Sequence, residues 1–190
     1  MPHDYLTIVS GLPRSGTSMM MQMLDAGGIP VLADGVRVSD ADNPRGYYEF
    51  ELVKKTKQDA TWLKDAGGKA VKIVHLLLMD LPATHQYRVL MMRRKMQEIL
   101  ASQKTMLDRN KRPGASVPPE QLARIFQQQF EKIDRWLAAQ PNFRVLSVDY
   151  NALLADPKPQ VEAISAFLDG RLDAAAMQAV VDPALYRQRG

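Results

Sequence analysis

The side chains with the clearest chemical potential lie near the amino terminus, in the run Gly11-Leu12-Pro13-Arg14-Ser15-Gly16-Thr17-Ser18. Glycines at 11 and 16 let the backbone fold tightly around an anion, because glycine adopts positive φ angles without steric cost. An apolar run, residues 4–10, precedes this turn, and an apolar-periodic run, residues 17–27, follows it. We therefore expect a strand, a loop and a helix whose first N–H groups and dipole point at a phosphate.

The turn differs from the Walker A loop of nucleotide triphosphatases at one position. That loop, G-x-x-x-x-G-K-[ST], would place a lysine where this chain has Thr17. The loss of this charge argues against ordinary phosphoryl transfer. The cation of the loop is instead Arg14. The pattern favours anion binding, and simple helix capping by small residues is the alternative.

A second set of polar side chains follows another apolar run. Residues 87–92 are predicted to form a buried strand, and residues 95–107 a helix. Arg94, Glu98 and Ser102 follow at i, i+4 and i+8, so they project from nearly the same helix face. A guanidinium and a hydroxyl arranged in this way can hold a phosphate. An ion pair at the start of the helix, between the arginine and the glutamate, is the alternative.

Two side chains are candidates for a general base. Glu49 follows a glycine turn and two tyrosines, and a carboxylate placed there can take a proton from an acceptor hydroxyl. It fits equally well as a surface carboxylate at the start of an expected helix, residues 50–65. His75 is the second candidate, in residues 69–79, a segment that starts as a strand and bends into a turn before Pro82. A histidine packed at the end of a strand is the alternative.

These motifs resemble those of sulfotransferases that use 3′-phosphoadenosine 5′-phosphosulfate (PAPS). In that family a lysine or arginine precedes Ser-Gly-Thr in the 5′-phosphosulfate loop, as Arg14 does here. The family's 3′-phosphate site has an arginine at a strand end, an acidic residue four positions later and a serine eight positions later. Arg94, Glu98 and Ser102 match this spacing. Bacterial relatives also carry an Asn-Pro-x-Gly-aromatic-aromatic-Glu run like residues 43–49 here.

The resemblance implies a role for each matched residue. Those expected to bind the donor are Arg14, Ser15, Gly16, Thr17, Ser18, Arg94 and Ser102. Arg14 would also stabilise the leaving phosphate oxygen, and Glu49 would act as the base. The donor would be PAPS, the product adenosine 3′,5′-bisphosphate, and the acceptor a hydroxyl or amine on a small molecule or carbohydrate. No metal is expected, because arginine supplies the countercharge.

The chain also departs from the family pattern. Cytosolic members carry Lys-x-His near the end of the equivalent strand, whereas Lys72 and His75 are one residue too far apart. Lys95 and Met96 replace the usual Asn-Pro or His-Pro after the arginine. The C-terminal Arg-Lys-Gly and Gly-x-x-Gly segment of the family is absent. A P-loop kinase or nucleotide triphosphatase, and a nucleotide-binding module without catalysis, are therefore the alternative functions.

Length and composition limit the class of protein. The chain has 190 residues, of which 46% are hydrophobic, and it shows no linker, so we expect one α/β domain over residues 1–190. The alternation of strands and helices predicts a three-layer P-loop-type fold with a central parallel sheet flanked by helices. The absence of cysteine, of an export signal and of a long apolar run suggests a cytoplasmic protein. The net charge of +4 suits an anionic ligand, and no basic cluster indicates nucleic acid.

Overall fold

The computed structural model describes residues 4–36, 46–109, 117–170 and 172–182, and the structural statements below concern these residues. Five parallel strands form one sheet in the order β2-β3-β1-β4-β5. The strands are β1 (Tyr5–Gly11), β2 (Val31–Leu32), β3 (Ala70–Lys72), β4 (Gln86–Arg93) and β5 (Phe143–Asp149). Because all five strands are parallel, their carboxyl ends meet at one edge of the sheet, which is where such folds bind ligands.

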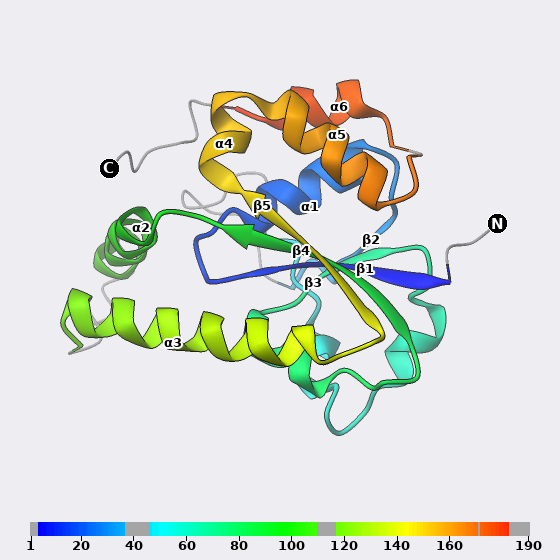
Figure 1. Ribbon diagram of the computed structural model, residues 1–190, viewed down its shortest axis with the longest axis horizontal. Coiled ribbons are helices and arrows are strands. Elements are labelled where there is room, and N and C mark those ends of the chain that lie inside the picture. The colour runs from blue at the N-terminus through cyan, green and yellow to red at the C-terminus, as the bar shows by residue number, and fades with distance from the viewer. Residues whose placement is uncertain (1–3, 37–45, 110–116, 171, 183–190) are drawn as a thin grey trace.

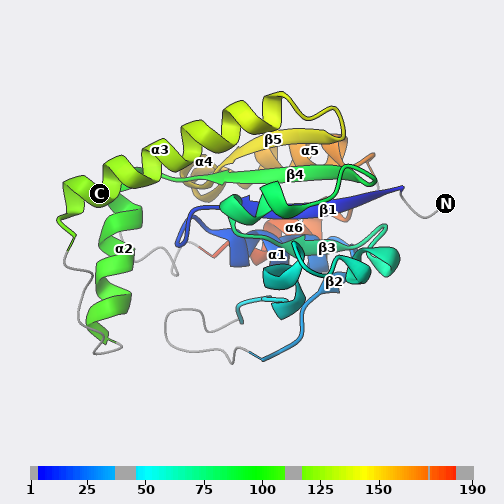
Figure 2. The same ribbon diagram turned by 90° about the horizontal axis from the view of Figure 1, so that it is seen from below.

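Helices cover both faces of this sheet, which confirms the predicted three-layer α/β fold (Figure 1). One face carries α1, α4, α5 and α6, and the other carries α3 together with three 3-10 segments (Figure 1), while α2 stands at the carboxyl edge (Figure 2). The α-helices are α1 (Thr17–Ala26), α2 (Met96–Arg109), α3 (Pro119–Ala138), α4 (Tyr150–Ala155), α5 (Pro157–Phe167) and α6 (Ala174–Val180). The 3-10 segments are η1 (Glu51–Lys55), η2 (Thr61–Asp65) and η3 (His75–Asp80).

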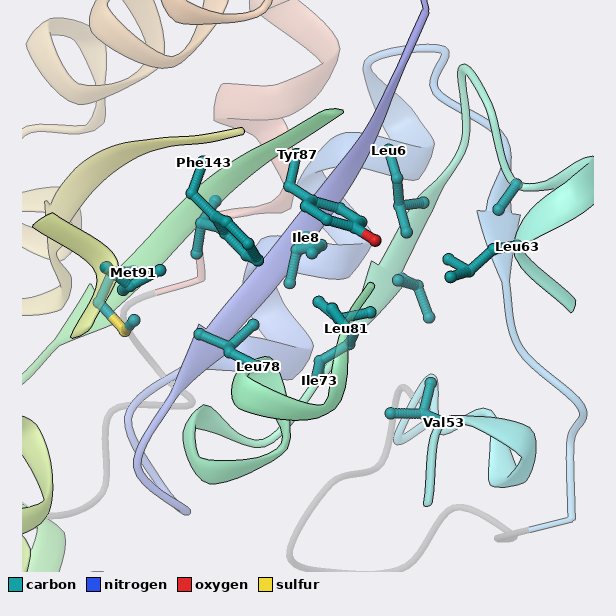
Figure 3. Close-up of a cluster of buried hydrophobic side chains, with 14 of the residues drawn as sticks. Leu6, Ile8, Val53, Leu63, Ile73, Leu78, Leu81, Tyr87, Met91 and Phe143 are labelled. Atoms are coloured by element: carbon teal, nitrogen blue, oxygen red, sulfur yellow. The ribbon is translucent and has the colours of Figure 1, made fainter. Parts of the chain in front are cut away.

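A separate hydrophobic cluster lies on each face of the sheet. Alternate residues of β1 and β4 enter opposite clusters, because successive side chains of a strand point to opposite faces. The cluster beneath α3 and the 3-10 segments includes Ile8, Tyr87 and Phe143 (Figure 3). The other cluster contains Met20 and Met23, which are fully buried, so the methionines of α1 fill the core as the helical spacing indicates.

The structure corrects one predicted element. The expected helix over residues 50–65 is wrong, since the chain there forms η1 and η2. A side chain interrupts the helical pattern between η1 and η2. The carboxylate of Asp59 accepts a hydrogen bond of 2.9 Å from the backbone N–H of Thr61, and such a bond competes with helix formation. The segment over residues 69–79 starts as the short strand β3 and continues as η3, in agreement with a strand that bends into a turn. The two short helices α4 and α6 were not predicted.

Candidate active site

The glycine turn at the end of β1 has the backbone that the sequence predicts. Gly11, Arg14 and Gly16 all have positive φ angles, of 154°, 68° and 96°. A Cβ atom at Gly16 would lie 2.3 Å from Cδ2 of Tyr150, so only glycine fits against this ring. Ser15 is fully buried and donates to the carbonyl of Leu12 through both its N–H (3.2 Å) and its hydroxyl (2.7 Å). Its side chain therefore holds the turn together.

The helix that follows this turn starts without a side-chain cap. Gly16 is its N-cap residue, and its first turn contains no acidic side chain. Thr17 and Ser18 lie in that first turn, and the Ser18 hydroxyl is 3.5 Å from the carbonyl oxygen of Tyr47. An uncapped helix N-terminus beside an arginine has the donors and the dipole direction that an anion requires.

The second predicted anion site, formed by Arg94 and Ser102, lies directly beside the glycine turn. Strands β1 and β4 are neighbours, and Gly11 is in register with Met92. Nη1 of Arg94 donates to the carbonyl oxygen of Arg14 at 2.9 Å, and Nε of Arg14 donates to Oγ of Ser102 at 2.9 Å. The structure thus brings together all the residues predicted to bind the donor, at one edge of the sheet.

Arg94 is oriented by a buried carboxylate. Its Nε donates to Oε2 of Glu98 at 2.9 Å, and the two side chains are 7% and 0% exposed. The amide Nδ2 of Asn151 donates to the other oxygen, Oε1, at 2.8 Å. The guanidinium also lies over the ring of Tyr150, 4.6 Å from its centroid. Arg14, whose side chain contacts Ser102 on the same helix as Glu98, adds a second cation to this edge of the sheet.

Glu49 lies in the irregular segment before η1, and its carboxylate is beside the end of β3, the strand next to β1. Its Oε1 is 3.7 Å from Nζ of Lys72, and that ammonium also donates to the carbonyl of Tyr47. The Tyr47 carbonyl is the group near the hydroxyl of Ser18, so one backbone position connects the carboxylate to the first turn of α1. The Glu49 side chain is 24% exposed, which leaves it accessible to a substrate.

His75 is placed differently from Glu49. It is buried, with Nδ1 3.2 Å from the carbonyl oxygen of Gly11 and Nε2 3.0 Å from Oε1 of Gln129. Burial lowers the pKa of His75 below its usual value. Since a carbonyl oxygen can only accept, Nδ1 donates to Gly11, and Nε2 is within hydrogen-bonding distance of the Gln129 side chain. His75 thus connects the end of β1 to α3.

Sequence reasoning missed four contributors to this site. Tyr150 and Asn151 follow β5, and their only signal is that they come directly after the end of a strand. Lys72 was noted for its distance from His75, and its contact with Glu49 was not foreseen. Gln129 lies on α3, far from any motif. Their roles depend on which strands become neighbours, which the local sequence does not encode.

Part of the predicted motif lies outside the described residues. This applies to Asn43, Pro44 and Arg45, which precede the two tyrosines. Among the residues that the structure describes, no group of three or more His, Asp or Glu side chains could hold a metal ion. No helix in that part of the chain is long and apolar enough to cross a membrane.

Solved structures of two sulfotransferase domains share this fold. The domain from the Synechococcus PCC 7002 olefin synthase aligns with a TM-score of 0.57 at 14% identity, covering 100% of this chain and 89% of that one. The domain from the curacin biosynthetic pathway aligns with a TM-score of 0.51 at 16% identity, covering 89% and 75% of the two chains. A search of curated proteins found no match.

The family comparison decides between the predicted functions. The sulfotransferase domain model matches residues 4–188, which include the glycine turn, Glu49 and the arginine after β4. The chain belongs to the sulfotransferase domain family, and its reaction is sulfuryl transfer.

Proposed function

We propose that this sulfotransferase takes its sulfuryl group from PAPS and transfers it to a hydroxyl or amine of a small molecule. One observation carries the proposal: the glycine turn and the Arg94 site are in direct contact, since Nη1 of Arg94 lies 2.9 Å from the carbonyl of Arg14. Two adjacent anion sites fit a single nucleotide with a phosphate at both its 5′ and 3′ positions.

The residues present fit each end of this donor. The backbone N–H groups of Gly16, Thr17 and Ser18 start an uncapped helix and would hold the 5′-phosphosulfate. Arg94 and Ser102 would hold the 3′-phosphate, with the guanidinium fixed by its buried carboxylate partner. The Ser15 side chain supports the turn rather than the ligand, because it is buried and bonded to Leu12.

Arg14 is the residue best placed to stabilise charge on the leaving group. Its Nε donates to Ser102, and a guanidinium has further N–H donors with which to contact a phosphate oxygen. A fixed cation aimed at developing negative charge lowers the transition-state energy without reorganisation. A magnesium ion is not needed for this role.

Glu49 is the proposed base. In the reaction the acceptor oxygen bonds to sulfur as the bond from sulfur to the phosphate oxygen breaks, and the acceptor proton passes to Glu49. Lys72, 3.7 Å from that carboxylate, orients it. His75 is a weaker candidate, because its two ring nitrogens already contact Gly11 and Gln129 in the core.

The proposal is tested by ligand binding and by a matched pair of variants. Titration calorimetry should show binding of adenosine 3′,5′-bisphosphate without magnesium, and weaker or no binding of ATP with magnesium. Incubation with PAPS and a small-molecule cell extract should give products that gain one SO₃ unit by mass spectrometry. Glu49→Gln should lower turnover on the order of 100-fold or more and leave bisphosphate affinity unchanged.

Glu51→Gln is the control, because Glu51 is two residues away and is paired with Lys54 at 2.5 Å. It should retain turnover. Magnesium-dependent ATP binding with no bisphosphate binding would instead favour a kinase or triphosphatase. Bisphosphate binding with no sulfated product would indicate a binding module that lacks catalysis.

A further inference from the structure

The start of α4 carries a polar side chain that belongs to none of the sequence motifs, that of Asn151. Strands β4 and β5 are parallel neighbours, and Arg93 is in register with Asp149. Helices α2 and α4 therefore begin at the same edge of the sheet, one after each strand (Figure 1). Asn151 reaches the arginine site at the end of β4 from this neighbouring strand.

The backbone of Asn151 is fixed by a helix cap. The carboxylate of Asp149, the N-cap residue of α4, accepts hydrogen bonds from the N–H groups of Asn151 (2.8 Å) and Ala152 (3.0 Å). A side-chain cap of this kind satisfies N–H groups of the first helical turn and stabilises that turn. The side chain of Asn151 therefore projects from a fixed point of the backbone.

The amide of Asn151 makes two contacts with the segment that follows β4. Its Nδ2 donates to Oε1 of Glu98 at 2.8 Å, and its Oδ1 accepts from the backbone N–H of Lys95 at 3.3 Å. A backbone N–H can only donate, so the amide oxygen faces Lys95 and the NH₂ group faces the carboxylate. An ionised carboxylate at this position would have no donor for Glu98, and alanine would have no polar group for either contact.

Glu98 connects this amide to Arg94. Its side chain is 0% exposed, and its other oxygen, Oε2, accepts from Nε of Arg94 at 2.9 Å. A carboxylate held at both oxygens cannot turn without breaking a hydrogen bond, and losing such a bond to a buried charge is costly. Asn151 therefore restricts the direction from which Glu98 meets the guanidinium.

The direction of the Arg94 guanidinium decides what it can bind. The group is planar and rigid, so the contact of its Nε with Glu98 also sets the directions of its two other nitrogens. In this orientation Nη1 donates to the carbonyl of Arg14 at 2.9 Å, and the group lies over the ring of Tyr150. A forked contact with a phosphate depends on the same orientation.

We infer that Asn151 is a positioning residue for the 3′-phosphate of the donor: it aims the carboxylate of Glu98, and through it the guanidinium of Arg94. The inference rests on the proposed function, in which Arg94 binds that phosphate. The alternative is a hydrogen bond that only joins α4 to α2. Its loss would lower stability without a preference for either end of the nucleotide.

Calorimetry with adenosine 3′,5′-bisphosphate and adenosine 5′-monophosphate separates these roles. Asn151→Ala should lower the affinity for the bisphosphate about tenfold, because it removes a hydrogen bond to a buried charge, and should change the affinity for the monophosphate less than about twofold. In an Arg94→Lys background the same change should cost less than about twofold, since the group that it positions is already gone. Gln97→Ala, at an exposed site beside Glu98 in sequence, is the control and should change neither affinity.

Asn151→Asp keeps the shape of the side chain, so it tests the inference even where the alanine variant is unstable. The charged or titratable groups around Glu98 are Arg94 before α2, Arg14 in the glycine turn, and Tyr150 at the start of α4. Burial raises the pKa of Tyr150, so this phenol stays neutral over the range to be tested. The pH dependence specific to this variant should therefore come from the new carboxylate and Glu98.

Two carboxylates in contact share one proton at low pH, and their total charge then equals that of Glu98 alone. The Asp149 carboxylate is turned toward the backbone of α4. At high pH both members of the new pair ionise and repel the phosphate. The bisphosphate affinity of Asn151→Asp, divided by that of the unmodified protein, should therefore fall about 30-fold between about pH 5.5 and about pH 8.5. Gln97→Glu adds the same charge at an exposed site, and its ratio should stay flat.

The results distinguish this inference from the proposed function. Unchanged bisphosphate affinity in Asn151→Ala, equal losses for both nucleotides, or a full loss in the Arg94→Lys background would each overturn the positioning role. So would a flat ratio for Asn151→Asp. In all these cases bisphosphate binding by the unmodified protein would still support the donor, whereas its failure to bind the bisphosphate would overturn the donor itself.

Discussion

The two ends of β4 use the same interactions for different purposes. Arg88, near the start of the strand, stacks on Tyr5 at 3.9 Å and pairs with Asp169 at 2.7 Å. It also donates to the carbonyl of Phe167, the last residue of α5, at 2.6 Å. A cation at a helix C-terminus stabilises the fold, because it meets the negative end of the dipole and satisfies a carbonyl.

Arg94, just beyond the other end of the strand, also stacks on a tyrosine and pairs with a carboxylate. Its surroundings differ in one respect, since a second guanidinium, that of Arg14, and the N-terminus of α1 lie beside it. Positive groups and a positive dipole end repel one another until an anion arrives. From this comparison we expect the amino edge of the sheet to contribute to the stability of the fold, and the carboxyl edge to contribute to the proposed ligand site.

The largest effect is expected from Arg94→Lys, which should weaken nucleotide binding at the carboxyl edge of the sheet. Lysine keeps the charge and loses the fork that reaches both Glu98 and the Arg14 carbonyl. We expect affinity for adenosine 3′,5′-bisphosphate to fall about 100-fold, or about 2.7 kcal/mol. Calorimetry with adenosine 5′-monophosphate is the control, and its affinity should change little because it lacks the 3′-phosphate. Equal losses for both nucleotides would contradict the assignment of Arg94.

Gly16→Ala should lower the stability of the protein at the same edge, because it introduces a steric clash and leaves the charge unchanged. Alanine at this position is strained by the φ angle of 96°, and its Cβ would meet the Tyr150 ring. Gly28→Ala is a matched control, since Gly28 also has a φ of 96° and nothing lies within 4 Å of its would-be Cβ. We expect urea denaturation to show a loss about 2 kcal/mol greater for Gly16→Ala than for Gly28→Ala. Equal losses would mean that strain alone matters.

Arg88→Met tests the amino edge of the sheet, where we expect a loss of stability and no loss of ligand affinity. It removes a helix C-terminal hydrogen bond, a partly exposed ion pair and a cation–π contact. We expect the free energy of unfolding to fall by about 1–2 kcal/mol, with bisphosphate affinity within twofold of the unmodified protein. A marked loss of affinity here would remove the distinction between the two edges.

The smallest effect expected is the pH dependence that His75 contributes. Burial lowers the pKa of this histidine, so the unfolded chain binds the proton at a higher pH than the folded protein does. The free energy of unfolding should therefore fall as the pH decreases below about 6.5, by at most about 1.4 kcal/mol per pH unit for this one group. In urea titrations at several pH values, His75→Asn should flatten this slope. His85→Gln, at a site more exposed to solvent, is the control; if it flattened the slope equally, His75 would not be the source.

Much of the fold followed from local patterns. The apolar run before Gly11 and the helical spacing after Gly16 predicted β1 and α1, and the run before Arg94 predicted β4 and α2. The error over residues 50–65 arose because Asp59 bonds to a backbone N–H and interrupts a helical pattern. Such a side-chain bond competes with the helix and is not visible in hydrophobic periodicity.

The sequence alone determined the chemistry available at each position: an arginine in a glycine turn, an arginine and a serine eight residues apart, and a carboxylate after two tyrosines. The tertiary structure decided which of these meet. Parallel pairing of β1 with β4 places Arg94 against Arg14, and pairing of β1 with β3 brings Lys72 and Glu49 to the same edge while His75 is buried. Strand order depends on the packing of the whole core, so contacts between distant segments emerge only when the chain folds.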